Sequence, residues 1–190
     1  MMVDWGSVFY DHFAKYLGEP IKRGVFRKNQ ESQSIQVLHY ENIFEGCTVF
    51  ASLGLSKYAS ELGTVAEVCL VTDCAFEESE NILANTLFYL IDNKINLGRG
   101  VSISGVSKIN EEFSKLYDKS AIYFTMPYAF PDGFEKIKPV GATDEGNIYL
   151  AFFLSQREHE FFVDKGAEIF ESILEDKDID PFILTRSSVI

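Results

Sequence analysis

The residues best suited to catalysis in this sequence are its histidines, and the spacing around one of them approaches a metal-binding motif. His159 is followed by Glu160, as in H-E-x-x-H, where two histidines on one helix face bind zinc and the glutamate acts as base. Val163 occupies the position of the second histidine. His12 and His39 fall in other predicted elements, so the closed ligand set of a zinc site is not formed. We therefore expect no metal site.

A glycine-rich stretch raises a second kind of chemistry, which is phosphate binding. Gly98, Gly100 and Gly105 are closely spaced, but a P-loop needs Lys and then Ser or Thr directly after its last glycine, and Val106 follows here. Ile103 stands where a dinucleotide-binding fingerprint has its third glycine. We interpret these glycines as turns before a strand and expect no cofactor.

The sequence also lacks a recognisable activated nucleophile. There is no G-x-S-x-G elbow. Cys47, Cys69 and Cys74 lie in or beside apolar strands, where an inert thiol is expected. Their odd number and the absence of C-x-x-C spacing favour reduced thiols in a cytosol. We predict that the protein is not an enzyme, while a site assembled from distant residues, such as His39 with Asp73, stays open as an alternative.

The most informative pattern is a row of carboxylates on the last predicted helix, at about residues 157–174. With about 100° per residue, the row falls within one arc of about 80° and apolar side chains lie opposite. The row consists of Glu160, Asp164, Glu168, Glu171 and Glu175. Like charges four residues apart disfavour a helix by a few tenths of a kcal/mol each, and no basic residue is interleaved. Two interpretations stay open: a solvated face that keeps the protein soluble, or a binding surface for a basic partner.

The charge of the whole chain bears on the choice of partner. The 190 residues include 29 acidic and 17 basic side chains, which gives a net charge of -12. Half of that excess lies between residues 157 and 180, which hold nine acidic and three basic residues. An acidic surface repels the phosphate backbone, so we expect no direct binding to nucleic acid, whereas a basic protein would be attracted.

The periodicity of apolar residues predicts the elements that would position these side chains. Phe9, Phe13 and Leu17 indicate an amphipathic helix that ends at Gly18 and lies on a sheet. Further helices are predicted at about 77–95, 111–117 and 157–174, and strands at 34–40, 47–53, 64–71, 121–126 and 147–155. Clustered strands with helices inserted between them favour one α+β domain over residues 1–190, with a mixed or mainly antiparallel sheet packed by helices.

Two strand predictions are more detailed. The segments 47–53 and 64–71 are expected to be antiparallel neighbours, because residues 54–63 suit a hairpin loop. The segment 147–155 is almost wholly apolar, as in a strand buried on both faces at the centre of a sheet. Its apolar run is far shorter than the roughly 20 residues needed to cross a bilayer, and no secretory signal precedes the domain. We therefore expect a cytoplasmic protein without a membrane partner.

Several segments together resemble the suppressor-of-fused-like domain. The resemblance covers residues 13 to 189 and rests on 48–58, 67–71 and 83–91, and on 148–154 followed by 157–170, 180–181 and 186–189. It implies a fold and no catalytic residues. The animal member of this family regulates a transcription factor, whereas short bacterial members resemble immunity proteins or antitoxins, and this chain matches the short type.

The resemblance and the charge together predict an immunity protein or antitoxin that binds a cognate toxin and blocks its active site or substrate surface. A basic nuclease is the toxin class that the charge favours. The first alternative is a regulatory module that sequesters a non-toxin protein. The second is a small enzyme whose site is not visible in the sequence.

Overall fold

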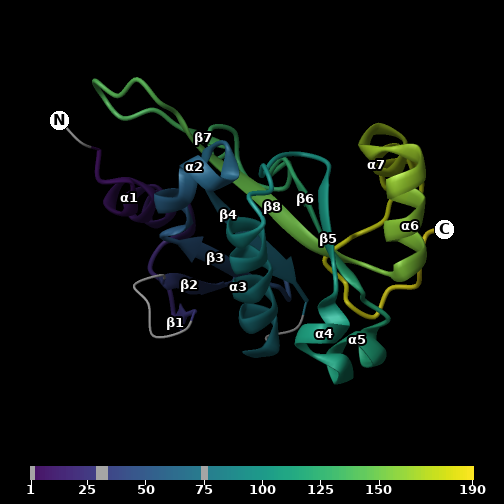
Figure 1. Cartoon of the computed structure of the whole chain (residues 1–190). Helices are drawn as coiled ribbons and strands as arrows, with labels where there is room; N and C mark the ends of the chain where they lie inside the picture. Colours follow the sequence, from purple (N-terminus) through teal and green to yellow (C-terminus); the bar gives the residue numbers. More distant parts are fainter. Residues whose placement is uncertain (1–2, 29–33, 74–76) are drawn as a thin grey trace.

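The computed structural model describes residues 3–28, 34–73 and 77–190 (Figure 1). The strands are β1 (Lys22–Arg27), β2 (Ser34–Glu41), β3 (Thr48–Leu53), β4 (Val65–Thr72), β5 (Val101–Ser104), β6 (Ala121–Thr125), β7 (Lys136–Ile137) and β8 (Gly146–Leu154). The helices are α1 (Trp5–Leu17), the 3-10 helix η1 (Leu55–Tyr58), α2 (Ala59–Leu62), α3 (Glu77–Asp92), α4 (Val106–Ile109), α5 (Glu111–Tyr117), α6 (Gln156–Lys165) and α7 (Ala167–Asp176).

The strands of the described chain form one eight-stranded sheet. Their order is β1-β2-β3-β4-β8-β6-β5, and β7 pairs with β8 outside that path. Strands β4 and β8 run parallel, whereas the other pairs among these residues are antiparallel. In Figure 1 α3 crosses the front of the sheet, α1 lies at its left end, and α6 and α7 stand at the right. The predicted α+β class with a mainly antiparallel sheet is confirmed.

Strand β8 confirms the prediction for the apolar segment 147–155. It lies inside the sheet between β4 and β6. Its last five residues are buried, because Phe152 and Leu154 pack on one face of the sheet and Ala151 and Phe153 on the other. A near-continuous apolar sequence is typical of a strand that is covered on both faces.

Helices cover the two faces of this sheet. Phe9 and Phe13 of α1 are fully buried in the same cluster as Val49 of β3, as predicted. Gly18, with a φ of 80°, ends α1, because glycine adopts positive φ without steric cost. Leu87 and the other buried hydrophobic residues of α3 belong to the cluster on the opposite face. No helix in the described ranges is both long and apolar enough to cross a membrane.

Strands β3 and β4 are antiparallel neighbours, as predicted, but the segment between them is more than a hairpin loop. It contains η1 and α2. The buried carboxylate of Glu67 accepts the N–H groups of Gly54, Leu55 and Ser56 at 2.8, 3.2 and 3.1 Å and the hydroxyl of Ser52 at 2.6 Å. Burial raises the pKa of Glu67, while the hydrogen bonds from Ser52, Gly54 and Ser56 oppose that rise. One buried acceptor therefore organises a turn that spacing alone did not predict.

The sequence prediction omitted β1, β5, β7 and α4. Strands β1 and β5 are the two ends of the sheet path. Many of their residues face solvent, so their apolar signal is weak. Strand β5 lies within the stretch that was predicted as glycine turns, between Gly100 at a φ of 79° and Gly105 at a φ of 108°. The turns are confirmed, and they enclose a short strand. Helix α3 also ends at Asp92, three residues before the predicted end at 95.

The prediction of one continuous last helix at about residues 157–174 is wrong. The segment divides at Gly166 into α6 and α7. Gly166 has a φ of 86° and a ψ of 171°, a combination that is essentially confined to glycine. Its N–H closes α6 by donating to the carbonyl of Phe162 at 2.8 Å, and its carbonyl accepts the N–H of Phe170 at 3.2 Å in α7. The two helices therefore have separate axes.

The chain after α7 is fixed by a buried charged pair. Arg186 donates to the two carboxylate oxygens of Glu158 in α6 at 2.5 and 3.1 Å, and to the carbonyl of Phe153 at 3.2 Å. The N–H of Val189 also donates to Glu158, at 3.0 Å. The Glu158 side chain is fully buried and that of Arg186 is 8% exposed. Burial raises the pKa of Glu158, but the bonds and charge of Arg186 together with the backbone N–H groups of Ser155 and Val189 outweigh burial and hold that pKa below its usual range.

Candidate functional site

The break at Gly166 redistributes the predicted row of carboxylates. Glu160 and Asp164 lie on α6, whereas Glu168, Glu171 and Glu175 lie on α7. The arc of about 80° assumed one straight helix with continuous periodicity, and that geometry is corrected here. The five residues remain at the same end of the molecule, where α6 and α7 are adjacent (Figure 1).

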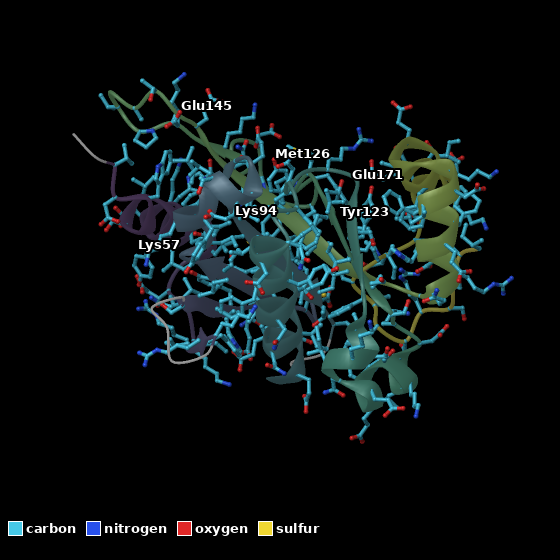
Figure 2. The ribbon with its side chains drawn as sticks, viewed as in Figure 1. Lys57, Lys94, Tyr123, Met126, Glu145 and Glu171 are labelled. Atoms are coloured by element: carbon cyan, nitrogen blue, oxygen red, sulfur yellow. The ribbon has the colours of Figure 1, made fainter. Side chains whose placement is uncertain are left out.

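The carboxylate of Glu171 faces the sheet, and its side chain is only partly exposed. One of its carboxylate oxygens accepts the hydroxyls of Tyr123 and Thr125 in β6, both at 2.7 Å. The other oxygen accepts the Nε–H of Arg99 at 2.9 Å and a second N–H of the same guanidinium. Figure 2 shows Tyr123 and Glu171 close together between the sheet and α7. No basic residue is interleaved within the row, but Glu171 has a basic partner outside it, Arg99, which comes from the loop before β5.

The surroundings of Glu171 keep it ionised. Burial raises its pKa, but the hydrogen bonds from Arg99, Thr125 and Tyr123 together outweigh that effect, so that the pKa of Glu171 lies below its ordinary value. This carboxylate therefore attaches α7 to β6, and both of its oxygens are already bound by residues of the protein itself.

The other four carboxylates of the row are exposed. Asp164 pairs with the adjacent Lys165 at 2.8 Å, and Glu160 accepts a side-chain N–H from Gln156 at 2.7 Å. Across the described residues, Glu168 and Glu175 form no ion pair within 4.0 Å. We call Glu160, Asp164, Glu168 and Glu175 the acidic face of α6 and α7. Its charges are largely uncompensated by the protein itself.

A cleft of about 390 Å³ lies beside this face, between α7 and the segment that follows β6. Its lining residues are Thr125, Tyr128, Phe152, Glu171, Leu174, Glu175, Asp178 and Ile179. Phe152 and Leu174 are buried, whereas Tyr128 is 63% exposed. Glu175 and Asp178 are exposed carboxylates. We call this feature the acidic cleft.

The acidic cleft combines apolar and acidic groups within one small volume. Such a surface favours a side chain with an apolar stem and a positive end, because the stem packs on carbon and the charge meets carboxylates or an aromatic ring. The sequence analysis did not select Tyr128 or Asp178. Tyr128 follows the predicted strand 121–126, and its position in the sequence does not indicate which element it faces.

The histidines and Asp73 are held by separate structural partners. The imidazole of His39 in β2 contacts the carboxylate of Glu80 in α3. The carboxylate of Asp73 accepts the N–H of Leu184 at 2.9 Å. His12 in α1 is within 3.1 Å of the Phe134 carbonyl. His39 and Asp73 therefore do not form the catalytic pair that was considered as an alternative from the sequence.

His159 also has a structural contact. Its Nδ1 lies 2.9 Å from the hydroxyl oxygen of Ser102, and that hydroxyl also donates to the carbonyl of Ile122 at 3.1 Å. Burial lowers the pKa of His159. Because the hydroxyl is shared with a backbone carbonyl, the contact links α6 to β5 and β6. Glu160, the would-be base of the zinc motif, is on the exposed face.

The two cysteines in the described part of the chain differ in burial. Cys69 is fully buried, and burial raises the pKa of its thiol far above the ordinary value. Cys47 is partly buried, and Cys74 lies outside the described residues. Within the described ranges, no three His, Cys, Asp or Glu side chains are placed to hold a metal ion.

The fold and the sequence together define the class of this protein. A sequence model of the family described as "Suppressor of fused protein (SUFU)" matches residues 31–187, so the chain belongs to that family, as its segments indicated.

Two individual proteins are informative relatives. Over 153 residues the chain is 26% identical to "Immunity protein YqcF" of Bacillus subtilis (strain 168), which covers 77% of this chain and 76% of that protein. The structure is similar to a SUFU homolog from Neisseria gonorrhoeae FA 1090, with a TM-score of 0.74 at 15% identity over 98% of this chain and 97% of the other. The structural likeness confirms the fold.

Proposed function

We propose that this chain is an immunity-type protein that binds a cognate toxin in the producing cell and neutralises it by forming a complex. The observation that carries the proposal is the acidic face of α6 and α7, whose carboxylates are exposed and of which Glu168 and Glu175 form no ion pair with another described residue. The name of the Bacillus relative, an immunity protein, agrees with this role.

The chemistry of the face favours a basic partner, and a nuclease is the partner class that fits best. A nuclease carries Lys and Arg to hold phosphates, so an acidic protein competes for the same surface. Opposite charges also accelerate encounter, which matters for an inhibitor that must reach its target before the substrate does. The net charge of -12 adds to this attraction over the whole molecule.

The contacts of the titratable residues support binding as the mode of action. His39 is held by Glu80, Asp73 by Leu184 and His159 by Ser102. Each of these contacts connects elements of the fold. Activation of a nucleophile needs such groups to converge, so we propose that neutralisation is stoichiometric.

The first experiment tests this role directly. The protein encoded by the adjacent open reading frame is produced in cells with and without this chain, and growth is compared. We expect rescue by co-expression, and a one-to-one loss of toxin activity when the purified proteins are mixed. Complete inactivation by a small molar fraction of this chain would instead identify an enzyme, and failure of the two proteins to interact would contradict the proposal.

The second experiment tests the acidic face. Glu160→Lys with Glu168→Lys reverses two exposed charges and leaves Glu171, which holds α7 to β6, untouched. We expect the association rate with the toxin to fall by about tenfold at low salt, and the difference to shrink as salt screens the charges.

The matched control is Glu45→Lys with Glu112→Lys, which changes the net charge equally at exposed positions in the β2–β3 turn and on α5. We expect a much smaller decrease from this control. An equal decrease for the two pairs would assign the effect to total charge and remove the acidic face from the proposal.

A further inference from the structure

We infer that the acidic cleft is a receptor for one guanidinium group, an arginine side chain displayed by the basic partner. This inference rests on the proposed function and specifies where and how that partner is held. It assigns the receptor to Tyr128, Glu175 and Asp178, with Phe152, Leu174 and Ile179 as the apolar surface.

The size and lining of the cleft suit a single long side chain. Its volume of about 390 Å³ lies near the lower end of the range of ligand pockets. An α-helix with its side chains is about 10–12 Å wide and needs a larger groove. The buried Phe152 and Leu174 with the partly buried Ile179 offer an apolar wall, against which the methylene stem of an arginine packs.

Two carboxylates of the cleft are available to a cation. Glu175 and Asp178 are exposed, and in the described part of the chain neither is within ion-pair distance of a basic side chain. Lys177 lies between them in the sequence, but its ammonium donates to the carbonyl of Val189 at 2.7 Å. The nearest basic residue along the chain is therefore engaged with the C-terminal segment and leaves this wall negative.

The same helix already binds a guanidinium at the neighbouring position. Arg99 donates two N–H groups to one oxygen of Glu171, while the other oxygen of Glu171 is occupied by Tyr123 and Thr125. Glu171 therefore closes one side of the cleft without being free to bind. Glu175, four residues later on α7, is the next carboxylate along the helix, and it is unoccupied by any residue of the described chain.

Tyr128 selects arginine over lysine. Its side chain is 63% exposed and lines the cleft. A planar guanidinium stacks on an aromatic ring and bonds to carboxylates through its edge at the same time, whereas an ammonium is a compact, strongly hydrated charge. Charge alone attracts both side chains, so the ring provides the preference.

The test uses the full chain and three blocked tripeptides, acetyl-Gly-Arg-Gly-amide and its lysine and citrulline counterparts. Citrulline has nearly the shape of arginine without the charge. Binding is followed by NMR chemical shifts of the ¹⁵N-labelled protein. We expect the arginine peptide to shift the amide signals of Thr125, Met126, Tyr128 and residues 174–179 saturably. We expect the lysine peptide to bind at least about threefold more weakly, and the citrulline peptide not to bind.

Variants separate the cleft from general acidity. We expect Tyr128→Ala to lower the affinity for the arginine peptide by about tenfold, and Glu175→Gln with Asp178→Asn to do the same. A tenfold decrease corresponds to the loss of one good contact. Tyr128→Phe keeps the ring and should bind as the unmodified protein does, which also shows that the position tolerates change. Glu160→Gln with Asp164→Asn removes the same charge from α6 and should alter binding by less than about twofold.

Equal weakening by the α6 pair, or equal binding of the citrulline peptide, would overturn the assignment. The partner experiment separates this inference from the proposed function. If the cleft variants bind and neutralise the toxin normally, the receptor is wrong and the function stands. If the unmodified protein does not bind the toxin but still binds the arginine peptide at the cleft, the proposed function is wrong and the assignment of the cleft as a guanidinium receptor stands.

Discussion

Helices α6 and α7 each carry one carboxylate that is bound by a distant arginine, and the two pairs differ in burial. Glu158 of α6 and Arg186 are almost fully enclosed, with 0% and 8% of their side chains exposed. Glu171 of α7 and Arg99 are 23% and 45% exposed. The remaining carboxylates of the two helices point to solvent. Residue type alone therefore does not distinguish a structural carboxylate from one that is available for binding.

The difference in burial sets the energetic weight of each pair. Removing one member of a buried pair leaves the other charge buried without a partner or water, and lowers the free energy of unfolding by about 3–5 kcal/mol. A more exposed pair is screened by water and contributes about 0–1 kcal/mol through its charges. Glu171 lies between these limits, because it also accepts two hydroxyls from β6. The comparison predicts a descending series of effects.

The largest effect is expected for Arg186→Met. This substitution leaves the Glu158 carboxylate buried without its cation, so we expect the free energy of unfolding to fall by about 3–5 kcal/mol. Urea unfolding followed by the fluorescence of the single tryptophan, Trp5, measures it. Adding Glu158→Gln should restore part of the loss. A decrease in unfolding free energy below about 1 kcal/mol, the contribution of an exposed pair, would show that the segment after α7 is held mainly by its apolar contacts.

The next effect concerns the break between the two helices. Gly166→Ala places a side chain at a φ of 86° and a ψ of 171°, where we expect a loss of about 1–3 kcal/mol from backbone strain alone. An added Cβ meets no atom within 4 Å at this position, so a steric clash is excluded. Gly98→Ala has equal space without a positive φ and should be much milder. Similar losses at the two glycines would remove the strain explanation.

A smaller effect is expected for Glu171→Gln, and it depends on pH. The folded-state pKa of Glu171 lies below the ordinary value of 4.5, so its charge stabilises the protein fully above that value. The stabilisation disappears as the pH falls through the lower, folded-state pKa. At pH 7 we expect the variant to be less stable by about 1–2 kcal/mol, and the gap to close in acid. Unfolding curves at several pH values test this, and a gap that widens in acid would contradict it.

The smallest effect is expected for Glu160→Gln on the acidic face. Glu160 is exposed and accepts only a side-chain N–H from Gln156, so we expect its stability change to stay within about 0.5 kcal/mol. Thermal unfolding beside the unmodified protein provides the measurement. A clear loss of stability would mean that the face serves the fold, which would weaken its assignment as a binding surface.

Local patterns were sufficient for much of the fold. Helix α5 occupies the predicted range 111–117, because the Asn110 side chain accepts the N–H of Phe113 at 2.8 Å to begin it and Asp118, with a φ of 51°, ends it. The apolar run of β8 likewise predicted an interior strand. These features depend on residues near in sequence, so periodicity and capping chemistry were enough. The family resemblance was also available from short segments.

The sequence by itself determined that α6 and α7 are acidic and amphipathic, and only the tertiary structure decided which carboxylates are free. Helical periodicity gives an angle about one axis, and a single glycine with non-helical torsions replaced that axis by two. Arg99, 72 residues before Glu171, turned one carboxylate of the predicted row into a structural contact. The cleft required Tyr128 after β6 and Asp178 after α7 to line the same hollow. Such meetings depend on how elements pack in space, and no local spacing encodes them.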